Sequence, residues 1–414
     1  MKHMRKTVSM VLLVLLVTTG VFASGQSEVE NPTVTVFWAL YDGLTEAYRE
    51  ELETAFEAEY PDIDLDIVPV PWDQMYDRLT TSLAGGDPPE VSVIGTRWLL
   101  EFMALDAVAP VGDYVSEATI DNIAEGAKEA VVNDVLMGLP VAAGARILTL
   151  NNEVTTLVPE TMEEMRQEAL RVTDDDTYGL FMPGQKHTEL TDFAYYFYAA
   201  GGDFFETESD GSFGRSTVNS PAGVKALEFM VQLANEDEVV PPGFLSMTRQ
   251  NGHPVFYSGD VGYVMIGAWV ESALAQAEAD FDVSYAQIPG FEGMPSQPLI
   301  ITDSLALFSE ADNLEEAGLF IDFFYQDEWK ARFDELIGFP PVTVSAASLP
   351  QFQSPLYQAL NEAAVNAKPW PLMEGWAEYS DIIWDAVSEA LLEEKSAQEA
   401  LDDAAAEIDG LRGL

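Results

Sequence analysis

The sequence predicts an α/β protein in which helices cover a mostly parallel sheet. Strand-like and helix-like patterns alternate from residue 33 to residue 105, and hydrophobic residues make up 48% of the 414 residues, enough for large cores. A chain of this length corresponds to roughly two to three domains. We find no internal repeat and no low-complexity linker, so short segments should join these domains.

Six elements are predicted in this first part of the chain. Strands are expected where apolar residues alternate, at 33–38, 63–67 and 90–94. Helices are expected where apolar residues recur every three or four positions, at 44–60, 71–86 and 98–105. Pro61 ends the first helix, and glycines end the second. This order is typical of a parallel sheet with helices as connections.

The rest of the chain continues with both kinds of element. Ser220-Pro221 has the sequence of a helix start, a capping residue followed by proline in the first turn. A segment rich in tyrosine and phenylalanine occupies 188–200. Strands are expected at 256–266 and 281–288, and helices at 314–325 and from about residue 379 to the end.

The charge of the chain excludes several classes of protein. Acidic residues number 71 and basic residues 19, so the formal net charge is −52. Proteins that bind nucleic acid or anionic lipid need a basic surface, and we therefore expect neither as a partner. A dense acidic surface that stays hydrated in a saline habitat explains the charge, with a calcium-rich surface as the alternative.

Residue types that carry chemistry are scarce. The chain has no cysteine, which excludes disulfides, cysteine–zinc sites and thiolate nucleophiles. Its three histidines, at positions 3, 187 and 253, have no metal-binding spacing. Residues 174–185 fit a calcium loop only in part, because Gln185 stands where a bidentate glutamate is required. We expect no cofactor, no metal and no catalytic residue, although 71 carboxylates leave a glycosidase pair open.

Residues 1–23 have the features of a secretory signal. Three basic residues precede an apolar run at 8–17, and residues 21–23 offer a cleavage site with small residues. The run is shorter than the roughly 20 residues that span a bilayer. We expect a periplasmic or otherwise extracytoplasmic, soluble protein with its signal peptide removed. It should have no lipid anchor, because the cysteine that would carry one is missing.

Aromatic residues at the ends of elements indicate a sugar site. A pyranose stacks its apolar face on an indole, and its hydroxyls pair with carboxylate, amide and guanidinium groups. Tyr41-Asp42, Thr96-Arg97-Trp98 and Trp269-Val270-Glu271 each place an aromatic ring beside such a group. The first two segments follow the first and third predicted strands, at the sheet edge where ligands bind. For any one tryptophan, closing a hydrophobic core is an equally good interpretation.

These segments resemble the family 1 extracellular solute-binding proteins, the carbohydrate-binding subunits of ABC importers, which are similar in fold to maltose-binding protein. The resemblance begins with FWALYDGLTEAYREELETAFEAEY at 37–60. It continues in order through GLPVAAGA (138–145), AGGDFF (200–205), FYSGDVGYVMIGAWV (256–270) and IGFPPV (337–342). The family implies two α/β lobes, a ligand cleft between them and three hinge crossings, with lobes that close over the ligand.

The resemblance also implies lobe limits. The N-terminal lobe would comprise 33–143 plus 286–330, and the C-terminal lobe 146–281 plus 331–414. The crossings would lie near 142–146, 282–286 and 329–331.

Family positions carry over to single residues. Residues 41–42 and 96–97 fall in the loops that contact ligand after the first and third strands. Trp269 falls at the family's stacking tryptophan, and Trp376 falls where the carboxyl-terminal part supplies another aromatic ring. The candidate ligand-binding residues are Trp38, Tyr41, Asp42, Thr96, Arg97, Trp269, Asp303 and Trp376.

Two departures from the family pattern concern the ligand. The family usually has an aromatic pair and then Asn-Lys after the first crossing, but residues 148–153 read LTLNNE. A floor residue for the sugar would then be missing. Thr302-Asp303 replaces a small pair, so Asp303 would intrude on the site or supply a new hydroxyl partner. The ligand would accordingly differ from the family's commonest ones.

We expect a monomer that binds a sugar or oligosaccharide and delivers it to ABC permease subunits by lobe closure, without covalent chemistry. Arg97 would clamp a hydroxyl or orient Asp42. Three alternatives stay open: an extracellular carbohydrate-active enzyme, a receptor that hands its closed lobes to a chemoreceptor or kinase, and a protein for an anionic ligand. A uronate oligosaccharide or glycerol phosphate would be such a ligand, with Arg97, Arg146 and Lys186 converging on it.

Overall fold

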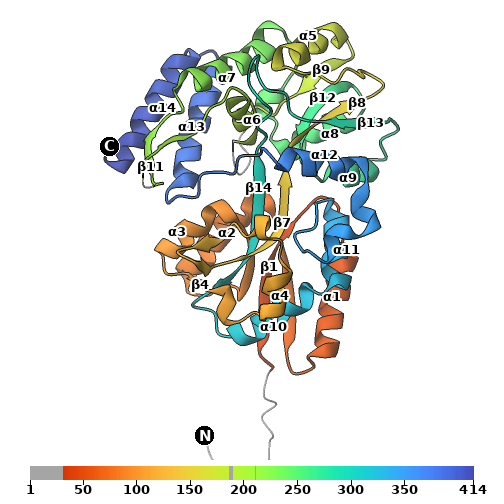
Figure 1. Ribbon diagram of the computed structural model, residues 1–414, viewed down its shortest axis with the longest axis vertical. Helices are drawn as coiled ribbons and strands as arrows, with labels where there is room; N and C mark the ends of the chain where they lie inside the picture. Colours follow the sequence, from red (N-terminus) through yellow and green to blue (C-terminus); the bar gives the residue numbers. More distant parts are fainter. Residues whose placement is uncertain (1–30, 186–189, 210) are drawn as a thin grey trace, which may run out of the picture. The chain divides into compact units, whose positions relative to one another are not determined.

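The computed structural model describes residues 31–185, 190–209 and 211–414. The predicted signal peptide at 1–23 lies outside these residues, as do Lys186 and His187. Residues 32–414 form one compact unit that contains two mixed sheets, each covered by helices (Figure 1).

The first sheet has the strand order β2-β1-β3-β14-β4, and β7 also pairs with β14. Its strands are β1 (Thr33–Leu40), β2 (Asp64–Pro71), β3 (Val91–Gly95), β4 (Val108–Ala109), β7 (Leu139–Ala145) and β14 (Ile300–Phe308). The first three strands pair in parallel, as the alternating pattern predicted. The other pairings are antiparallel, so the sheet is mixed rather than mostly parallel.

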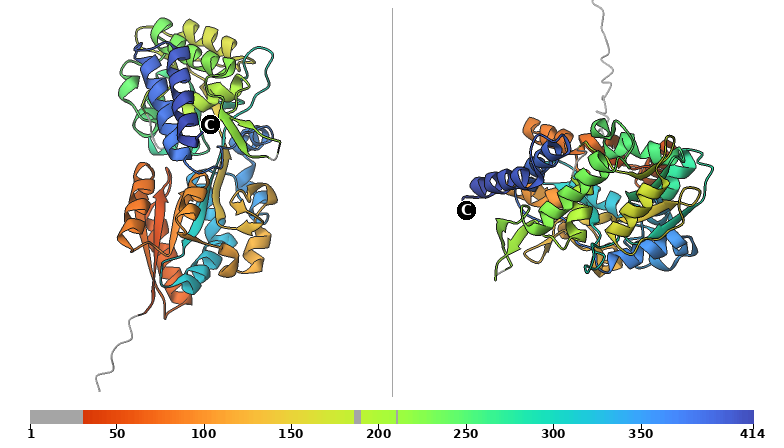
Figure 2. Two further views of the ribbon diagram at one scale, coloured as in Figure 1. Left: turned by 90° about the vertical axis from the view of Figure 1, so that its left-hand side faces the viewer. Right: turned by 90° about the horizontal axis from the view of Figure 1, so that it is seen from above.

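Helices lie on both faces of this sheet (Figure 2). They are α1 (Glu46–Glu59), α2 (Trp72–Gly85), α3 (Leu99–Ala104), α4 (Glu117–Asn122), α10 (Leu314–Phe324) and α11 (Asp327–Ile337). Trp38 of β1 is fully buried, and its ring meets Phe324 of α10 and Phe333 of α11 edge to face at 4.9 and 5.5 Å. Burial of such large rings is a main source of the apolar stabilisation of this core.

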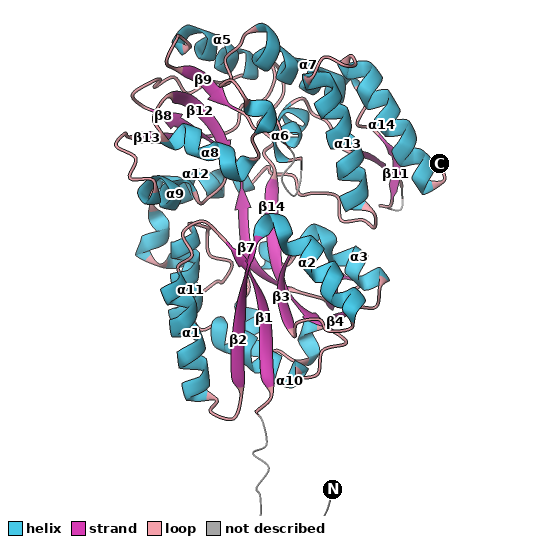
Figure 3. Ribbon diagram, turned by 180° about the vertical axis from the view of Figure 1, so that it is seen from behind, coloured by secondary structure: helices cyan, strands magenta, loops and turns pink. Residues whose placement is uncertain are grey.

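The second sheet has the order β13-β8-β12-β9. Its strands are β8 (Ile147–Asn151), β9 (Tyr178–Phe181), β12 (Val261–Ile266) and β13 (Val283–Ala286). The helices in this part are α5 (Met162–Val172), α6 (Thr191–Ala199), α7 (Pro221–Val231), α8 (Arg249–Tyr257), α9 (Val270–Gln276), α12 (Pro355–Ala364), α13 (Trp376–Leu391) and α14 (Ala397–Arg412). The last two lie side by side (Figure 3). Two small hairpins complete the fold: β5 (Val131–Val132) with β6 (Val135–Leu136), and β10 (Phe205–Thr207) with β11 (Phe213–Ser216).

One predicted strand is partly wrong. Residues 256 and 257 end helix α8 instead of starting a strand. The helix begins at Thr248, whose hydroxyl accepts a hydrogen bond from the backbone N–H of Asn251, an N-cap that the alternating pattern does not reveal. Gly259, at φ +97°, then turns the chain into β12.

The chain passes between the two sheets at identifiable places. Arg146 separates β7 from β8, within the first predicted crossing. The second passage, between β13 and β14, begins after the predicted residues 282–286, because most of these lie in β13. Residues 329–331 lie inside α11, whose Trp329 packs on Tyr48 of α1, so the third passage also comes later. The lobe limits themselves stay a prediction.

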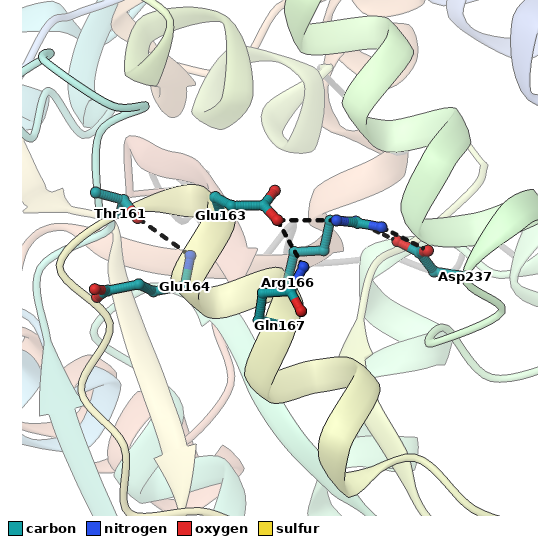
Figure 4. Close-up of polar contacts among 6 residues, drawn as sticks. All are labelled: Thr161, Glu163, Glu164, Arg166, Gln167 and Asp237. Carbon is teal, nitrogen blue, oxygen red and sulfur yellow. Dashed lines mark hydrogen bonds and ion pairs between the residues drawn. The ribbon is translucent and has the colours of Figure 1, made fainter.

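A bidentate ion pair holds α5 against the segment that follows α7 (Figure 4). Arg166 donates from Nε and Nη2 to the two carboxylate oxygens of Asp237, at 2.5 and 2.9 Å, and from Nη1 to Glu163. The Thr161 hydroxyl caps the helix by accepting from the backbone N–H of Glu164. Fork-to-fork geometry of this kind fixes orientation as well as adding free energy.

A buried ion pair lies inside the first core. Lys330 and Asp334 are one turn apart on α11, are fully buried and form a hydrogen-bonded pair. Burial raises the pKa of Asp334 to about 7, against the effect of Lys330, and burial lowers the pKa of Lys330. Desolvation of two charges offsets most of their attraction, so the pair matters chiefly because neither member can be removed alone.

Lys330→Met should lower the free energy of unfolding by about 3–5 kcal/mol at pH 8, because it leaves a buried carboxylate without its cation. The loss should shrink at pH 5. The raised pKa of Asp334 means that the folded state keeps a proton that the unfolded chain releases, so stability is recovered as the pH falls through the folded-state value. Urea unfolding at both pH values measures this, and the double variant Lys330→Met/Asp334→Leu should recover the wild-type midpoint. A single variant as stable as the wild type at pH 8 would contradict this account.

Candidate functional site

A cavity of about 310 Å³ is lined by residues from both sheets and their connections. From the first sheet come the loop after β1, the start of α2 and the first half of β14. From the second come Arg146, helices α8 and α9, and Trp269 at the N-cap of α9, while Phe339 follows α11. The lining residues used below are Tyr41, Asp42, Trp72, Arg146, Arg249, His253, Tyr257, Trp269, Asp303 and Phe339. This volume lies at the low end of the roughly 300–1,000 Å³ found for small-molecule pockets.

On the first-sheet side, Asp303 organises the polar groups. The Tyr41 hydroxyl donates to its Oδ2 at 2.9 Å, and Nη1 of Arg97 lies 3.9 Å from its Oδ1. Asp303 stands on β14 opposite Gly95 of β3 and Ala142 of β7, so small neighbours leave room for the carboxylate. Burial and the charge of Asp303 raise the pKa of Tyr41 well above 10, so its hydroxyl is a proton donor at physiological pH.

Arg97 lies behind this wall and does not line the cavity. Its guanidinium carbon is 4.6 Å from the ring centre of Trp98 and 5.9 Å from that of Trp72. Gly95 makes this position possible, since a Cβ there would lie 2.4 Å from Nη1 of Arg97. The buried cation is thus held by ring faces and by Asp303.

On the second-sheet side, Trp269 is the centre of a stack. The guanidinium carbons of Arg146 and Arg249 lie 4.7 and 5.0 Å from its ring centre. His253 and Phe339 stack at 6.2 and 6.1 Å, with interplanar angles of 27° and 26°. The indole is therefore only 8% exposed.

Positive and negative charges are matched around the cavity. Arg146 donates from Nε to the hydroxyl of Tyr195 at 3.2 Å. Burial raises the pKa of Tyr195 to about 12. The charge of Asp192 adds to this rise in the pKa, while the charges of Arg146 and Arg249 oppose it. At the cavity mouth, loss of hydration raises the pKa of Asp42, and the charge of Arg249 opposes this. Among the described residues, the arginines and carboxylates that line the cavity are two of each, Arg146 and Arg249 with Asp42 and Asp303.

The structure brings together four of the eight candidate residues: Tyr41, Asp42, Trp269 and Asp303 line the cavity. Arg97 lies behind Asp303, with Thr96 beside it; the Thr96 hydroxyl is hydrogen-bonded to Ser304 and buried. Arg97 forms an ion pair with Asp303, and its predicted role in orienting Asp42 stays a prediction.

Two other candidates, Trp38 and Trp376, lie in the hydrophobic cores and not in the lining of the cavity. Trp38 is fully buried in the first core, as described above. Trp376 is 1% exposed, and its ring packs on Phe204 and Trp370 in the second core, at 5.0 and 5.5 Å. Both rings are covered by other apolar side chains, so each tryptophan closes a core.

Sequence reasoning missed several cavity residues. Trp72 directly follows β2 at the same sheet edge as Tyr41, a signal that could have placed it in the cavity. Arg249 and His253 lie one turn apart on α8. The sequence pattern predicts no helix at 249–257, so it does not place these two side chains at the cavity. Phe339 follows Gly338, whose φ of +76° ends α11. No local signal connects Phe339 with Trp269.

Metal binding finds no support among the residues that the structure describes: no group of three or more histidine, aspartate or glutamate side chains is placed to hold an ion. The partial calcium loop is a turn before β9, in which Asp174 Oδ1 accepts from the backbone N–H groups of Asp176 and Thr177. The described chain also has no helix long and apolar enough to cross a membrane.

Comparison with known proteins now decides the family. The profile described as bacterial extracellular solute-binding protein matches residues 41–331. The chain belongs to this family. A binding protein of Brucella abortus (strain 2308) is 28% identical to it over 382 residues, which cover 90% of this chain and 92% of the relative.

Solved structures of this kind share the fold. The maltose-bound MalE3 of T. maritima superposes with a TM-score of 0.81 at 20% identity, over 92% of this chain and 99% of that one. The maltotriose-binding protein of Thermus thermophilus, bound with maltotriose, gives 0.80 at 22% identity, over 91% and 99%. The two-lobed α/β fold is therefore that of the maltose-binding proteins. Members of the family bind solutes for ABC transporters and are not enzymes, so the enzyme alternative is ruled out.

Gly267→Ala tests the packing of the Trp269 stack. A Cβ at this position would lie 2.0 Å from a ring carbon of Trp269 and 2.5 Å from Nη1 of Arg146. We expect the free energy of unfolding to fall by about 1–3 kcal/mol, the usual effect of overpacking. Gly112→Ala is the control, because no atom lies within 4 Å of its Cβ position. Urea unfolding of both variants measures the difference, and equal stabilities would show that the stack is loose.

Proposed function

We propose that this solute-binding protein takes up a neutral sugar or short oligosaccharide in the cavity between its sheets and delivers it to an ABC permease by lobe closure. The observation that carries the proposal is the lining itself. Aromatic rings from both sheets surround a small space whose polar groups are held in place by contacts within the protein. Groups ordered in advance cost less entropy on binding.

The chemistry of the lining suits hydroxyl groups. Asp42 and Asp303 present acceptor oxygens to the cavity, while Arg146 and Arg249 bring N–H donors from the opposite side. Charge-assisted hydrogen bonds of this kind are shorter and stronger than neutral ones. The half-buried rings of Tyr41 and Trp72 supply the apolar wall that the C–H groups of a sugar need.

The matched charges favour a neutral ligand over an anionic one. An anion would need cations that outnumber the nearby carboxylates, whereas two arginines and two aspartates line this cavity among the described residues. Lys186, the third cation of the anionic alternative, lies outside the described residues. The structural relatives support the same choice, since maltose and maltotriose are bound in two of them.

Location and delivery complete the proposal. A signal peptide at 1–23, cleaved on export, fits the extracellular family, and the absence of cysteine argues against a thioether lipid anchor. The permease partnership follows from the family. A receptor that signals through a chemoreceptor or kinase would use the same cavity.

A thermal-shift screen tests the ligand class. The panel contains glucose, maltose, maltotriose and arabinotriose, with galacturonate and glycerol 3-phosphate as anions. A neutral sugar at a hundredfold excess over its dissociation constant should add about 2.7 kcal/mol of stability and raise Tm. The thermal-shift measurements are repeated at high salt, where ions weaken the repulsion between the charges of the acidic surface. Shifts with the anions alone would replace the neutral-sugar proposal, and no shift at all would overturn it.

Asp303→Asn tests the site. The substitution keeps the size of the side chain and removes the charged acceptor, so we expect the affinity for the sugar found in the screen to fall by roughly tenfold or more. Calorimetric titration measures it. Asp66→Asn is the matched control, because Asp66 is exposed on β2, away from the cavity. An unchanged affinity in Asp303→Asn would remove this residue from the site.

A further inference from the structure

The geometry points to Trp269 as a positioning residue: its indole holds the guanidinium groups of Arg146 and Arg249 at the cavity, and Arg249, the more exposed of the two, contacts the sugar in place of the indole face. The inference rests on the proposed function and specifies which side chains on one wall of the cavity recognise the ligand. It replaces the expectation, taken from the family position, that Trp269 itself stacks on a sugar ring.

The first step of the argument is the coverage of the indole. A tryptophan that offers a face to a sugar must keep that face open. Trp269 is 8% exposed, and four side chains lie around its ring with centres 4.7–6.2 Å away. Two of the four are guanidinium groups within the roughly 6 Å range of a cation–π contact.

The second step is the position of the two arginines. Both line the cavity, Arg146 from the passage between the sheets and Arg249 from the first turn of α8. Because each lies within 5.0 Å of the same ring centre, the indole sets their separation and tilt. A guanidinium group presents its N–H donors at the edge of a plane, so stacking on a ring leaves those donors pointing sideways.

The third step is the support behind the stack. Arg146 is 2% exposed, and its Nε donates to the Tyr195 hydroxyl at 3.2 Å. Gly267 leaves the space that the indole and Nη1 of Arg146 fill. Phe339 stacks on the indole from the segment after α11. These contacts fix the ring, and the ring in turn fixes the more exposed Arg249.

The ligand chemistry follows from the donors. Planar N–H groups carried side by side match two neighbouring oxygens, and a vicinal pair of sugar hydroxyls provides such oxygens. Asp42, at the cavity mouth near Arg249, supplies acceptors for the hydroxyl protons. The wall therefore selects a sugar with an unsubstituted vicinal diol.

A double-mutant cycle tests the inference, with the panel sugar that raises Tm most as the probe. Arg249→Gln and Trp269→Leu should each weaken its binding by about tenfold, the ratio that 1.4 kcal/mol produces. If Trp269 acts through the arginines, the double variant should also be about tenfold weaker, because the second change removes nothing further. A loss of about a hundredfold in the double variant would show independent contacts and overturn the inference.

Controls separate the possible failures. Arg78→Gln is the matched arginine control, because Arg78 lies 4.7 Å over the ring of Phe37, outside the cavity, and the variant should bind normally. If Trp269→Leu fails to fold, the affinity of Trp269→Phe is measured instead. This variant keeps a ring face for the guanidinium groups and should bind within about threefold of the wild type, whereas a loss of tenfold or more would overturn the inference. Wild-type affinity in Arg249→Gln would overturn this inference alone. A wild-type protein that binds no panel sugar would overturn the proposed function as well.

Discussion

The hydrogen bond from the backbone N–H of Arg146 to the carbonyl of Leu299, 2.8 Å long, joins two of the segments in which the chain passes between the sheets. Leu299 is in turn bridged to Lys368, which leads toward the last two helices. The side chain of Arg146 enters the cavity and lies on Trp269. Any movement of one sheet against the other must therefore act on a residue that also shapes the cavity.

Burying arginines in a chain of net charge −52 constrains the surroundings of the cavity. A buried guanidinium group is stable only where rings and carboxylates replace its hydration. Arg97 has Trp98 and Asp303, and Arg146 has Trp269 and Tyr195. Glycines at 95 and 267 give both side chains the space to lie flat. The polar groups are thus ordered by the protein itself.

The family comparison and the cavity carry different kinds of information. Sequence identities of 20 and 22% with two solved structures that share the fold show how little of the sequence the two-lobed architecture requires. The cavity side chains, Asp303 among them, are known from this chain alone. A fold of this kind supports many ligands, so the ligand has to be argued from side chains.

The sequence by itself determined the family, the strand–helix order of the first part and the loop after β1, because local periodicity and ordered motifs report them directly. It also placed Tyr41, Asp42, Trp269 and Asp303 at the cavity. Only the tertiary structure decided that Trp38 and Trp376 belong to cores. It also decided that Arg97 forms an ion pair with Asp303. Likewise, only the folded chain brings Arg249 and Phe339 into contact with Trp269. A tryptophan has the same local pattern whether its face is covered or open. The rings that cover it come from residues far away in the sequence, such as Phe333 on Trp38, 333 − 38 = 295 positions apart, which only folding brings into contact.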